Sequence, residues 1–156
     1  MEEMRLEKKI EELLAEKKYS EIKDIFAQMN GADISALFEE VPENKIPLLF
    51  RLLPKVLAAE TFVEMEADAQ KMLIQGFSDN ELKDVFNELY LDDAVDIVEE
   101  MPANVVKRIL ANTDPDTRKM INEVLKYPDD SAGSIMTIEY VSLRLNMTVE
   151  EAIKRI

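Results

Sequence analysis

The chain has 156 residues, of which 47% are hydrophobic and 33% charged, a composition typical of one folded domain of ordinary size. It contains no cysteine and no histidine, which excludes disulfides, thiol nucleophiles, His-dependent triads and His/Cys zinc sites. Its net charge of −14 disfavours nucleic acid and anionic lipid as partners, since both need basic surfaces, and favours cations and basic partners.

No segment of the sequence has the character of a membrane span. The longest apolar region, residues 46–59, is interrupted by Pro47, Arg51, Pro54 and Lys55. It falls short of the roughly 18 apolar residues that cross a bilayer, and the N-terminus lacks the apolar core of a signal peptide. We therefore expect a cytosolic chain that does not insert into a membrane by itself.

A twelve-residue repeat of apolar residues extends from residue 10 to residue 113. Its four columns fall at i, i+3, i+4 and i+7 within each unit, which is the spacing of one face of an α-helix. The columns have three polar exceptions, Thr61, Gln70 and Thr113, and Lys17 interrupts the first unit. The most regular column consists of Phe26, Phe38, Phe50, Phe62, Ile74, Phe86, Val98 and Leu110.

Proline, glycine and capping residues recur near the ends of the units, so each unit is predicted to be a helix of two to three turns and a corner. Ser78 to Glu81 has the pattern of a capping box, and Asp114 precedes Pro115 as an N-cap. Helices this short must stack to be stable. The sequence therefore predicts an all-α superhelix of about eight to ten short helices over residues 1–126. The alternative is a helical bundle in which some corners become kinks.

The pattern changes after the last predicted helix, at about residues 116–126. Tyr127-Pro128 is expected to end this helix, because the residue before a proline is displaced from the helical region. Asp129 and Asp130 favour a turn, and residues 127–136 are predicted to form a linker.

Residues 137–156 differ from everything before them. Partial alternation over Tyr140 to Leu143 predicts a strand, and Thr148 to Glu151 has the pattern of a second capping box at the start of a helix. A strand followed by about two helical turns cannot bury a core. We therefore expect these residues to begin a domain that continues beyond Ile156.

Four segments occur in an order and at spacings that are not generic: "LLPKVLAAE", "LYLDDAVDIVEEMP", "YPDDSAGSIMTIEYV" and "TVEEAI". Together they closely resemble the N-terminal domain of MgtE-type magnesium transporters and the joint at which it passes into the first of two CBS domains. The resemblance extends from about Asp33 to Ile153. It implies that residues 137–156 are the truncated start of the first CBS domain.

The resemblance also implies a right-handed superhelix and a regulatory rather than an enzymatic role. Family members are homodimers whose N and CBS domains form a magnesium sensor on the cytoplasmic side of a transmembrane pore, which this chain lacks. Magnesium ions bound among acidic residues hold the N and CBS domains together and favour the closed pore. The implied partners are therefore the CBS domains and the pore of the same full-length chain.

Glu60, Asp92 and Asp96 are the magnesium ligands that the resemblance implies within this domain. Mg²⁺ takes oxygen ligands in an octahedron and keeps several waters. Asp92 and Asp96 lie four residues apart and outside the apolar columns, so on a helix they share an exposed face. Spacing alone leaves open a second interpretation, in which the acids complement the dipole at a helix start or form a solvated face.

The neighbouring acids carry weaker expectations. Asp93 lies one residue off the face of Asp92 and Asp96. Because the CBS acids that would share the ions are missing, we expect Mg²⁺ to bind weakly in this chain or to leave the site unoccupied. The acids expected to be solvent-exposed without a metal role are Glu39, Glu40, Glu99 and Glu100.

Asn30-Gly31 stands where the family commonly has His-Pro, which is expected to affect a corner and no proposed ligand.

The main alternative function is an acidic helical-repeat scaffold that binds protein partners, with its charge serving solubility. A catalytic function has little support, because the three glycines are isolated and no nucleophile has a histidine base.

Overall fold

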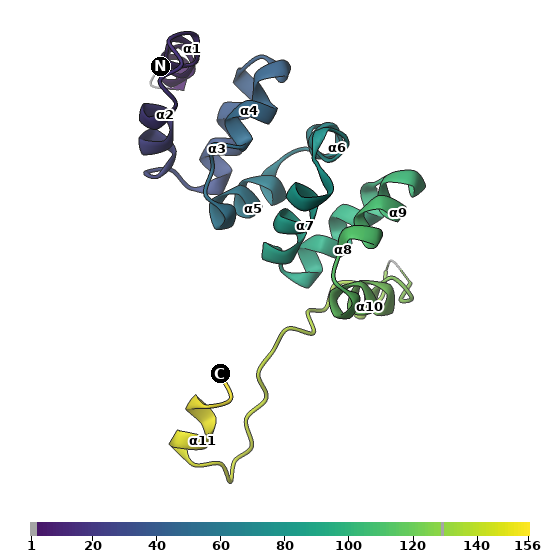
Figure 1. Cartoon of the computed structure of the whole chain (residues 1–156). Coiled ribbons are helices and arrows are strands. Elements are labelled where there is room, and N and C mark those ends of the chain that lie inside the picture. The colour runs from purple at the N-terminus through teal and green to yellow at the C-terminus, as the bar shows by residue number, and fades with distance from the viewer. Residues whose placement is uncertain (1–2, 129) are drawn as a thin grey trace.

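The computed structural model describes residues 3–128 and 130–156, which form eleven α-helices, one 3-10 helix and no strand (Figure 1). The elements are α1 (Glu3–Ala15), α2 (Tyr19–Phe26), α3 (Gly31–Glu40), η1 (Glu43–Lys45), α4 (Ile46–Phe50), α5 (Lys55–Glu64), α6 (Ala67–Gly76), α7 (Asp79–Glu88), α8 (Leu91–Glu100), α9 (Ala103–Asn112), α10 (Pro115–Val124) and α11 (Val149–Ile153).

The twelve-residue repeat is confirmed by the positions at which the elements begin. From Tyr19 to Pro115 a new element starts every twelve residues, with η1 and α4 together filling one unit. The helices α3 and α5 to α10 each contain ten residues, or nearly three turns, and two residues separate each of α5 to α9 from the next helix. The first ten α-helices therefore agree with the predicted eight to ten, and the alternative of a bundle with kinked corners is wrong.

One column of the repeat lies at the corners and not, as expected, on the helix face. Met65, Phe77 and Met101 each follow the last residue of a helix, and each has an extended backbone with ψ between 144° and 148°. Their side chains are nonetheless buried. An extended residue turns its side chain back into the core while the chain changes direction, so the i+7 position is apolar without being helical.

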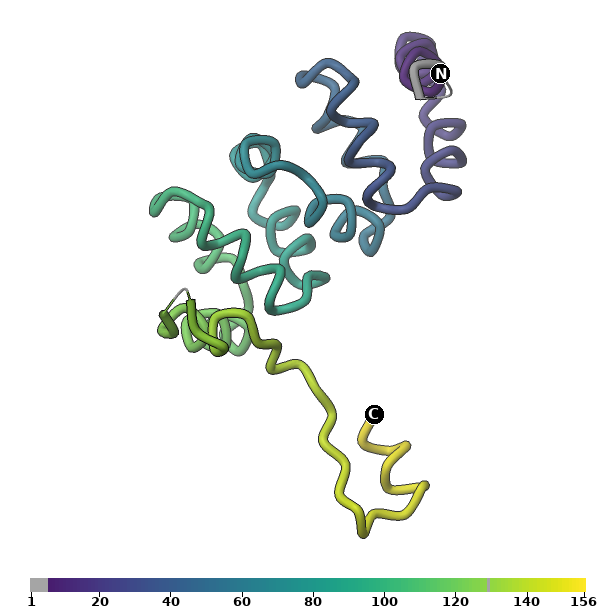
Figure 2. Tube along the Cα trace, turned by 180° about the vertical axis from the view of Figure 1, so that it is seen from behind, coloured from purple at the N-terminus to yellow at the C-terminus, as the bar shows by residue number. Residues whose placement is uncertain are grey.

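Helices two apart in the sequence pack on each other. Such pairs are α1 with α3, α3 with α5, α5 with α7, α7 with α9, and α8 with α10, whereas α1 also packs on its neighbour α2 and α6 packs on α9. Figures 1 and 2 show the result as an elongated stack that runs from the N-terminus to α10, with α11 standing apart from it. Because the helices cover one another in this way, their apolar faces are buried within the stack.

The phenylalanine column forms the centre of the core. The rings of Phe26 and Phe38 meet edge to face with centroids 6.2 Å apart, and those of Phe50 and Phe62 do so at 6.1 Å. Phe62 also contacts Phe86, with centroids 6.3 Å apart. Such edge-to-face pairs stabilise a core beyond the area that they bury, by about 0.5–1.5 kcal/mol each.

The three polar exceptions to the repeat are all buried, and each forms a hydrogen bond with a backbone carbonyl. The hydroxyls of Thr61 and Thr113 donate to the carbonyls four residues earlier, at 2.7 and 2.9 Å. The amide of Gln70 donates to the carbonyl of Phe62 at 2.8 Å. A buried polar group is tolerated when it is hydrogen-bonded, so these residues occupy core positions without breaking the pattern.

Lys17 interrupts the first unit because it ends α1 in a left-handed conformation, with φ of 56°. The N–H groups of Lys17 and Lys18 donate to the carbonyls of Leu14 and Leu13, at 3.1 and 2.9 Å. These two bonds are those of a Schellman motif, in which glycine usually occupies the left-handed position.

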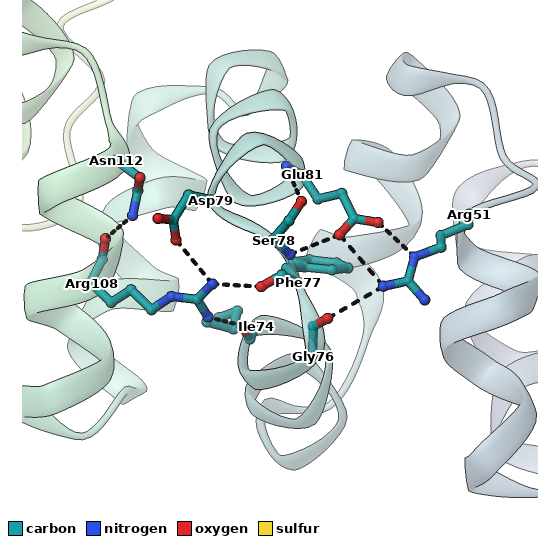
Figure 3. A network of polar contacts seen from close by, with 9 residues as sticks. All are labelled: Arg51, Ile74, Gly76, Phe77, Ser78, Asp79, Glu81, Arg108 and Asn112. Carbon is teal, nitrogen blue, oxygen red and sulfur yellow. Dashed lines mark hydrogen bonds and ion pairs between the residues drawn. The ribbon is translucent and has the colours of Figure 1, made fainter.

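Two arginines hold the corner between α6 and α7 from opposite sides (Figure 3). Arg108, on α9, donates to the carbonyls of Ile74 and Phe77 at 2.6 and 2.5 Å and pairs with Asp79 at 3.1 Å. Arg108 thus satisfies carbonyls that the end of α6 leaves without helical partners.

Arg51 reaches the same corner from the other side. It bonds to the Glu81 carboxylate at 2.6 Å and to the Gly76 carbonyl at 3.3 Å. Glu81 is also the acidic member of the predicted capping box, which is confirmed, because its carboxylate accepts from the Ser78 N–H at 2.8 Å. The guanidinium of Arg51 lowers the pKa of Glu81 to about 2.

The last helix of the stack lies close to its predicted place, from Pro115 to Val124 instead of about residues 116 to 126. The Asp114 side chain accepts from two N–H groups at the start of α10, as predicted. Gly133 lies against the ring of Tyr127, so closely that a Cβ atom at this glycine would overlap the ring. Asp130 lies in a turn, as expected, whereas Asp129 lies outside the described residues.

The predicted strand at Tyr140 to Leu143 is wrong for this chain, since residues 130–156 contain no strand. A strand needs a neighbour to take its hydrogen bonds, and the described residues supply none here. The predicted capping box is confirmed, because Thr148 and Glu151 exchange both bonds at the start of α11. Residues 140–156 leave many large apolar side chains exposed, among them Tyr140, Leu145 and Ile153.

Candidate metal-binding surface

Helix α8 positions two of the three residues expected to bind magnesium. Its apolar side is buried in the stack, and the opposite side carries Asp92 in the first turn and Asp96 one turn later. Both side chains are exposed, as the sequence predicted. A helix start favours negative charge, so this position stabilises the Asp92 carboxylate whether or not an ion is bound.

Asp93 lies near four other carboxylates. Its side chain is only partly exposed, and burial raises its pKa, followed by the repulsion of Asp92, Asp96, Glu64 and Glu139. These residues come from α8, from the end of α5 and from the segment after the joint. The five form an acidic cluster whose charges oppose one another, and a bound cation would relieve that repulsion.

Glu139 contacts the beginning of α8 directly. The backbone N–H of Leu91, the first residue of α8, donates to the Glu139 carboxylate at 2.7 Å. Tyr90 precedes the helix and makes no side-chain cap. A carboxylate from 48 residues further along the chain therefore takes the place of a local N-cap.

Glu60 lies on α5, one helical turn before Glu64, and is exposed. The α5 carboxylate that acts on Asp93 is Glu64. Gly31, which was expected to affect no proposed ligand, is packed against the backbone of Glu60. The close approach of α3 to α5 therefore positions Glu60.

The donor chemistry of this surface fits Mg²⁺, which prefers carboxylate and water oxygens. Among residues 3–128 and 130–156, however, no group of three or more acidic side chains is arranged to hold a metal ion. An ion at this surface would take its remaining ligands from water or from another domain. The acids assigned to the solvent are indeed exposed: Glu39, Glu40, Glu99 and Glu100.

Two members of the acidic cluster were not predicted from the sequence. Glu64 could have been found, because it lies four residues after Glu60 and so shares its helical face. Glu139 had no comparable signal, since the sequence does not show that the segment after the joint returns to the start of α8.

The comparisons with known proteins decide the family. Residues 29–130, well over half of the chain, match the MgtE intracellular N domain. The chain belongs to this family. The match covers every helix from α3 to α10, including the acidic residues on α5 and α8.

Two magnesium transporters are similar to this MgtE N domain in sequence. The magnesium transporter MgtE of Thermus thermophilus is 31% identical over 97% of this chain and 34% of its own length. The magnesium transporter MgtE of Bacillus subtilis is 23% identical over 92% of this chain and 32% of its own length. The chain thus spans about a third of the curated relatives that it matches.

Two solved structures share the fold. The cytosolic domain of the Mg²⁺ channel MgtE in complex with ATP has a TM-score of 0.82 and 30% identity, over 92% of this chain and 59% of that one. The soluble part of a magnesium transporter has a TM-score of 0.82 and 24% identity, over 97% of this chain and 60% of that one. No helix in the part of this chain that the structure describes is long and apolar enough to cross a bilayer.

Proposed function

We propose that this MgtE N domain is the magnesium-sensing, gating part of a magnesium transporter and acts on the cytoplasmic face of the membrane. Its partners are the CBS domains and the pore of the same full-length chain, which acts as a homodimer. No catalytic step is assigned to it. The observation that carries the proposal is the acidic cluster at the start of α8, to which three separate elements contribute carboxylates.

Repulsion between carboxylates is the physical basis of the sensing. An acidic surface repels a second acidic surface unless cations lie between them, and Mg²⁺ replaces the repulsion by bridging. Asp92 and Asp96 are proposed to supply ligands from α8, and Glu60 from α5. Magnesium then favours the arrangement in which the N and CBS domains are in contact and the pore is closed, which is a shift between two populations.

The test uses a chain extended through both CBS domains. Compaction is followed by small-angle scattering during a Mg²⁺ titration, with Asp92→Asn/Asp96→Asn as the test variant. We expect the wild type to become more compact as Mg²⁺ rises and the variant to need much more Mg²⁺ for the same change.

The matched control is Glu39→Gln/Glu40→Gln, which removes the same charge from the exposed end of α3. It should compact like the wild type. The assignment of Asp92 and Asp96 fails if their variant compacts as readily as the control, and the sensing function fails if the wild type ignores Mg²⁺.

One structural feature favours the alternative, a scaffold for protein partners. A cavity of about 540 Å³ lies beside α1 and α3 and is lined by Leu6, Met29 and Leu37 together with Asp33, Glu39 and Glu40. The scaffold function predicts that binding of a basic partner depends on Glu39 and Glu40 and that compaction is indifferent to Mg²⁺. The same two variants therefore separate the two functions.

A further inference from the structure

The segment after the joint is attached to the superhelix at one place. Ile138 packs against the core of the superhelix. The Glu139 carboxylate then accepts from the Leu91 N–H at 2.7 Å. From Tyr140 onward nearly all side chains are exposed. Glu139 is thus the point at which the chain leaves the superhelix.

The contact made by Glu139 has a defined role in helix geometry. The first N–H groups of an α-helix have no partner within the helix, and Leu91 is the first residue of α8. A carboxylate is a strong acceptor for such a group and is also favoured by the helix dipole. The contact therefore joins the exit of the chain to the helix turn that carries Asp92 and Asp93.

The same contact is opposed by its surroundings. Asp93 is repelled by Glu139 and also by Glu64, Asp92 and Asp96. The hydrogen bond and the dipole attract the Glu139 carboxylate, whereas the acidic cluster repels it. The balance between these forces depends on how far cations neutralise the cluster.

We propose that Glu139 is a positioning residue, which fixes the direction in which the chain leaves the superhelix by capping α8 beside the acidic cluster. The magnesium dependence of this contact rests on the proposed function, whereas the contact itself does not. Neutralisation of the cluster strengthens the cap, so magnesium binding and the exit direction of the chain are coupled through one helix end.

The Leu91 amide gives a direct test in the 156-residue chain. Its hydrogen exchange is measured by NMR in the wild type and in the Glu139→Ala and Glu139→Gln variants. Loss of a bond to a charged acceptor should speed exchange at Leu91 by about tenfold or more in Glu139→Ala. Glu139→Gln keeps an acceptor oxygen and should retain most of the protection.

The absence of cysteine allows a second readout by spin labels. Labels are attached through Ala111→Cys on α9 and Ser142→Cys beyond the contact, both at exposed positions. The distance distribution between them should be narrow in the wild type and broaden at least about twofold in Glu139→Ala, as for an untethered terminus. In Glu139→Gln the distance distribution should be nearly as narrow as in the wild type.

The control variant is Glu150→Ala, which removes an exposed carboxylate from the same segment but away from α8. It should leave both readouts unchanged, and the Val98 amide, deep within α8, serves as an internal check that the helix is intact. The proposal is overturned if Glu139→Ala leaves Leu91 protection and the distances unchanged, or if Glu139→Gln behaves like Glu139→Ala.

Millimolar Mg²⁺ supplies the final comparison, with K⁺ at equal ionic strength as reference. Mg²⁺ should increase Leu91 protection in the wild type more than K⁺ does. If the Glu139 variants behave as expected but Mg²⁺ has no more effect than K⁺, the cap stands and its coupling to magnesium is overturned. If Mg²⁺ does increase Leu91 protection but the extended chain does not become more compact with Mg²⁺, the gating function alone is refuted.

Discussion

The backbone of Glu60 lies directly against Gly31. A Cβ atom at Gly31 would come within 2.7 Å of the Glu60 carbonyl carbon and 2.8 Å of the Thr61 nitrogen. Both are atoms of the α5 backbone, which cannot move aside as a flexible side chain does. Gly31 therefore sets how closely α3 and α5 approach each other, and with it the position of a proposed magnesium ligand.

Gly31→Ala should destabilise the domain. The added methyl group has to separate α3 from α5, and such overpacking typically lowers the free energy of unfolding by about 1–3 kcal/mol. Urea denaturation of the 156-residue chain measures this loss. Gly76→Ala is the control, because no heavy atom lies within 4 Å of a Cβ at that position.

The control is expected to change stability in the opposite direction. Gly76 is the last residue of α6 and has no positive φ, so alanine fits there and should stabilise the chain by about 0.4–1 kcal/mol. Equal destabilisation by both variants would show that glycine itself, rather than the contact with Glu60, is what the fold requires.

Arg108→Lys should weaken the corner between α6 and α7. The guanidinium bonds to two carbonyls and one carboxylate at once, and an ammonium cannot reproduce that planar arrangement. We expect a loss of about 1–2 kcal/mol in the free energy of unfolding, because carbonyls at the helix end lose their donors.

Two companion variants show which of the Arg108 contacts matters. Asp79→Asn should cost less than about 0.5 kcal/mol, since that ion pair is largely exposed. Lys107→Ala, at an exposed neighbouring position, should also have a small effect. If Asp79→Asn greatly lowers the free energy of unfolding and Arg108→Lys does not, the ion pair holds the corner and the carbonyl contacts do not.

The architecture could be predicted from the sequence because the apolar positions of the repeat are the positions that the fold buries. Residues such as Phe62 and Phe86 are buried by the same local geometry in every unit, so the pattern appears directly in the residue types. The i+7 column was expected on the helix face but lies at the corners, because the side chain of an extended residue can point into the core just as that of a helical residue can. Apolar periodicity alone does not distinguish them.

The candidate site was less predictable, for a different physical reason. The exposure of Asp92 and Asp96 follows from their place outside the apolar columns. The contact between Glu139 and Leu91 depends on where a segment without periodicity returns to the superhelix, and residue types do not encode that return. The strand at Tyr140 was predicted from local preference, but a strand forms only with a partner.

Glu81 should make stability depend on acid pH. Arg51 and the Ser78 cap lower the pKa of Glu81 to about 2, below the ordinary value of 4.5. A lowered pKa in the folded state means that the ionised carboxylate stabilises the fold at neutral pH. This contribution is complete above about pH 4.5 and is lost as the pH falls towards 2.

Unfolding free energies of the wild type and Glu81→Gln at neutral and acid pH measure this contribution. The ion pair is partly solvated, so we expect about 1 kcal/mol or less from it at neutral pH and a smaller difference near pH 3. Glu88 is an exposed glutamate on the same helix. For Glu88→Gln, the difference in unfolding free energy from the wild type should not shrink as the pH falls. A difference that grows as the pH falls would contradict the assigned role of Arg51.

Asp93 should have the opposite dependence on pH. Burial and the neighbouring carboxylates raise its pKa, so the ionised form is less favourable in the folded state than in the unfolded one. The stabilisation associated with the protonated carboxyl is complete below the unfolded pKa and is lost as the pH rises through the folded pKa. Asp93→Asn imitates the protonated form at every pH.

Asp93→Asn is therefore expected to be more stable than the wild type at neutral pH and equal to it at acid pH. The gain should be about 0.5 kcal/mol or less, because the side chain is partly solvated. Glu99→Gln, exposed on the same helix, should give no comparable gain.

Millimolar Mg²⁺ should reduce the advantage of Asp93→Asn if ions neutralise the acidic cluster, and thermal unfolding in Mg²⁺ and in K⁺ at equal ionic strength measures the difference. A destabilising Asp93→Asn would show that the carboxylate is held by an attractive contact and is not under repulsion.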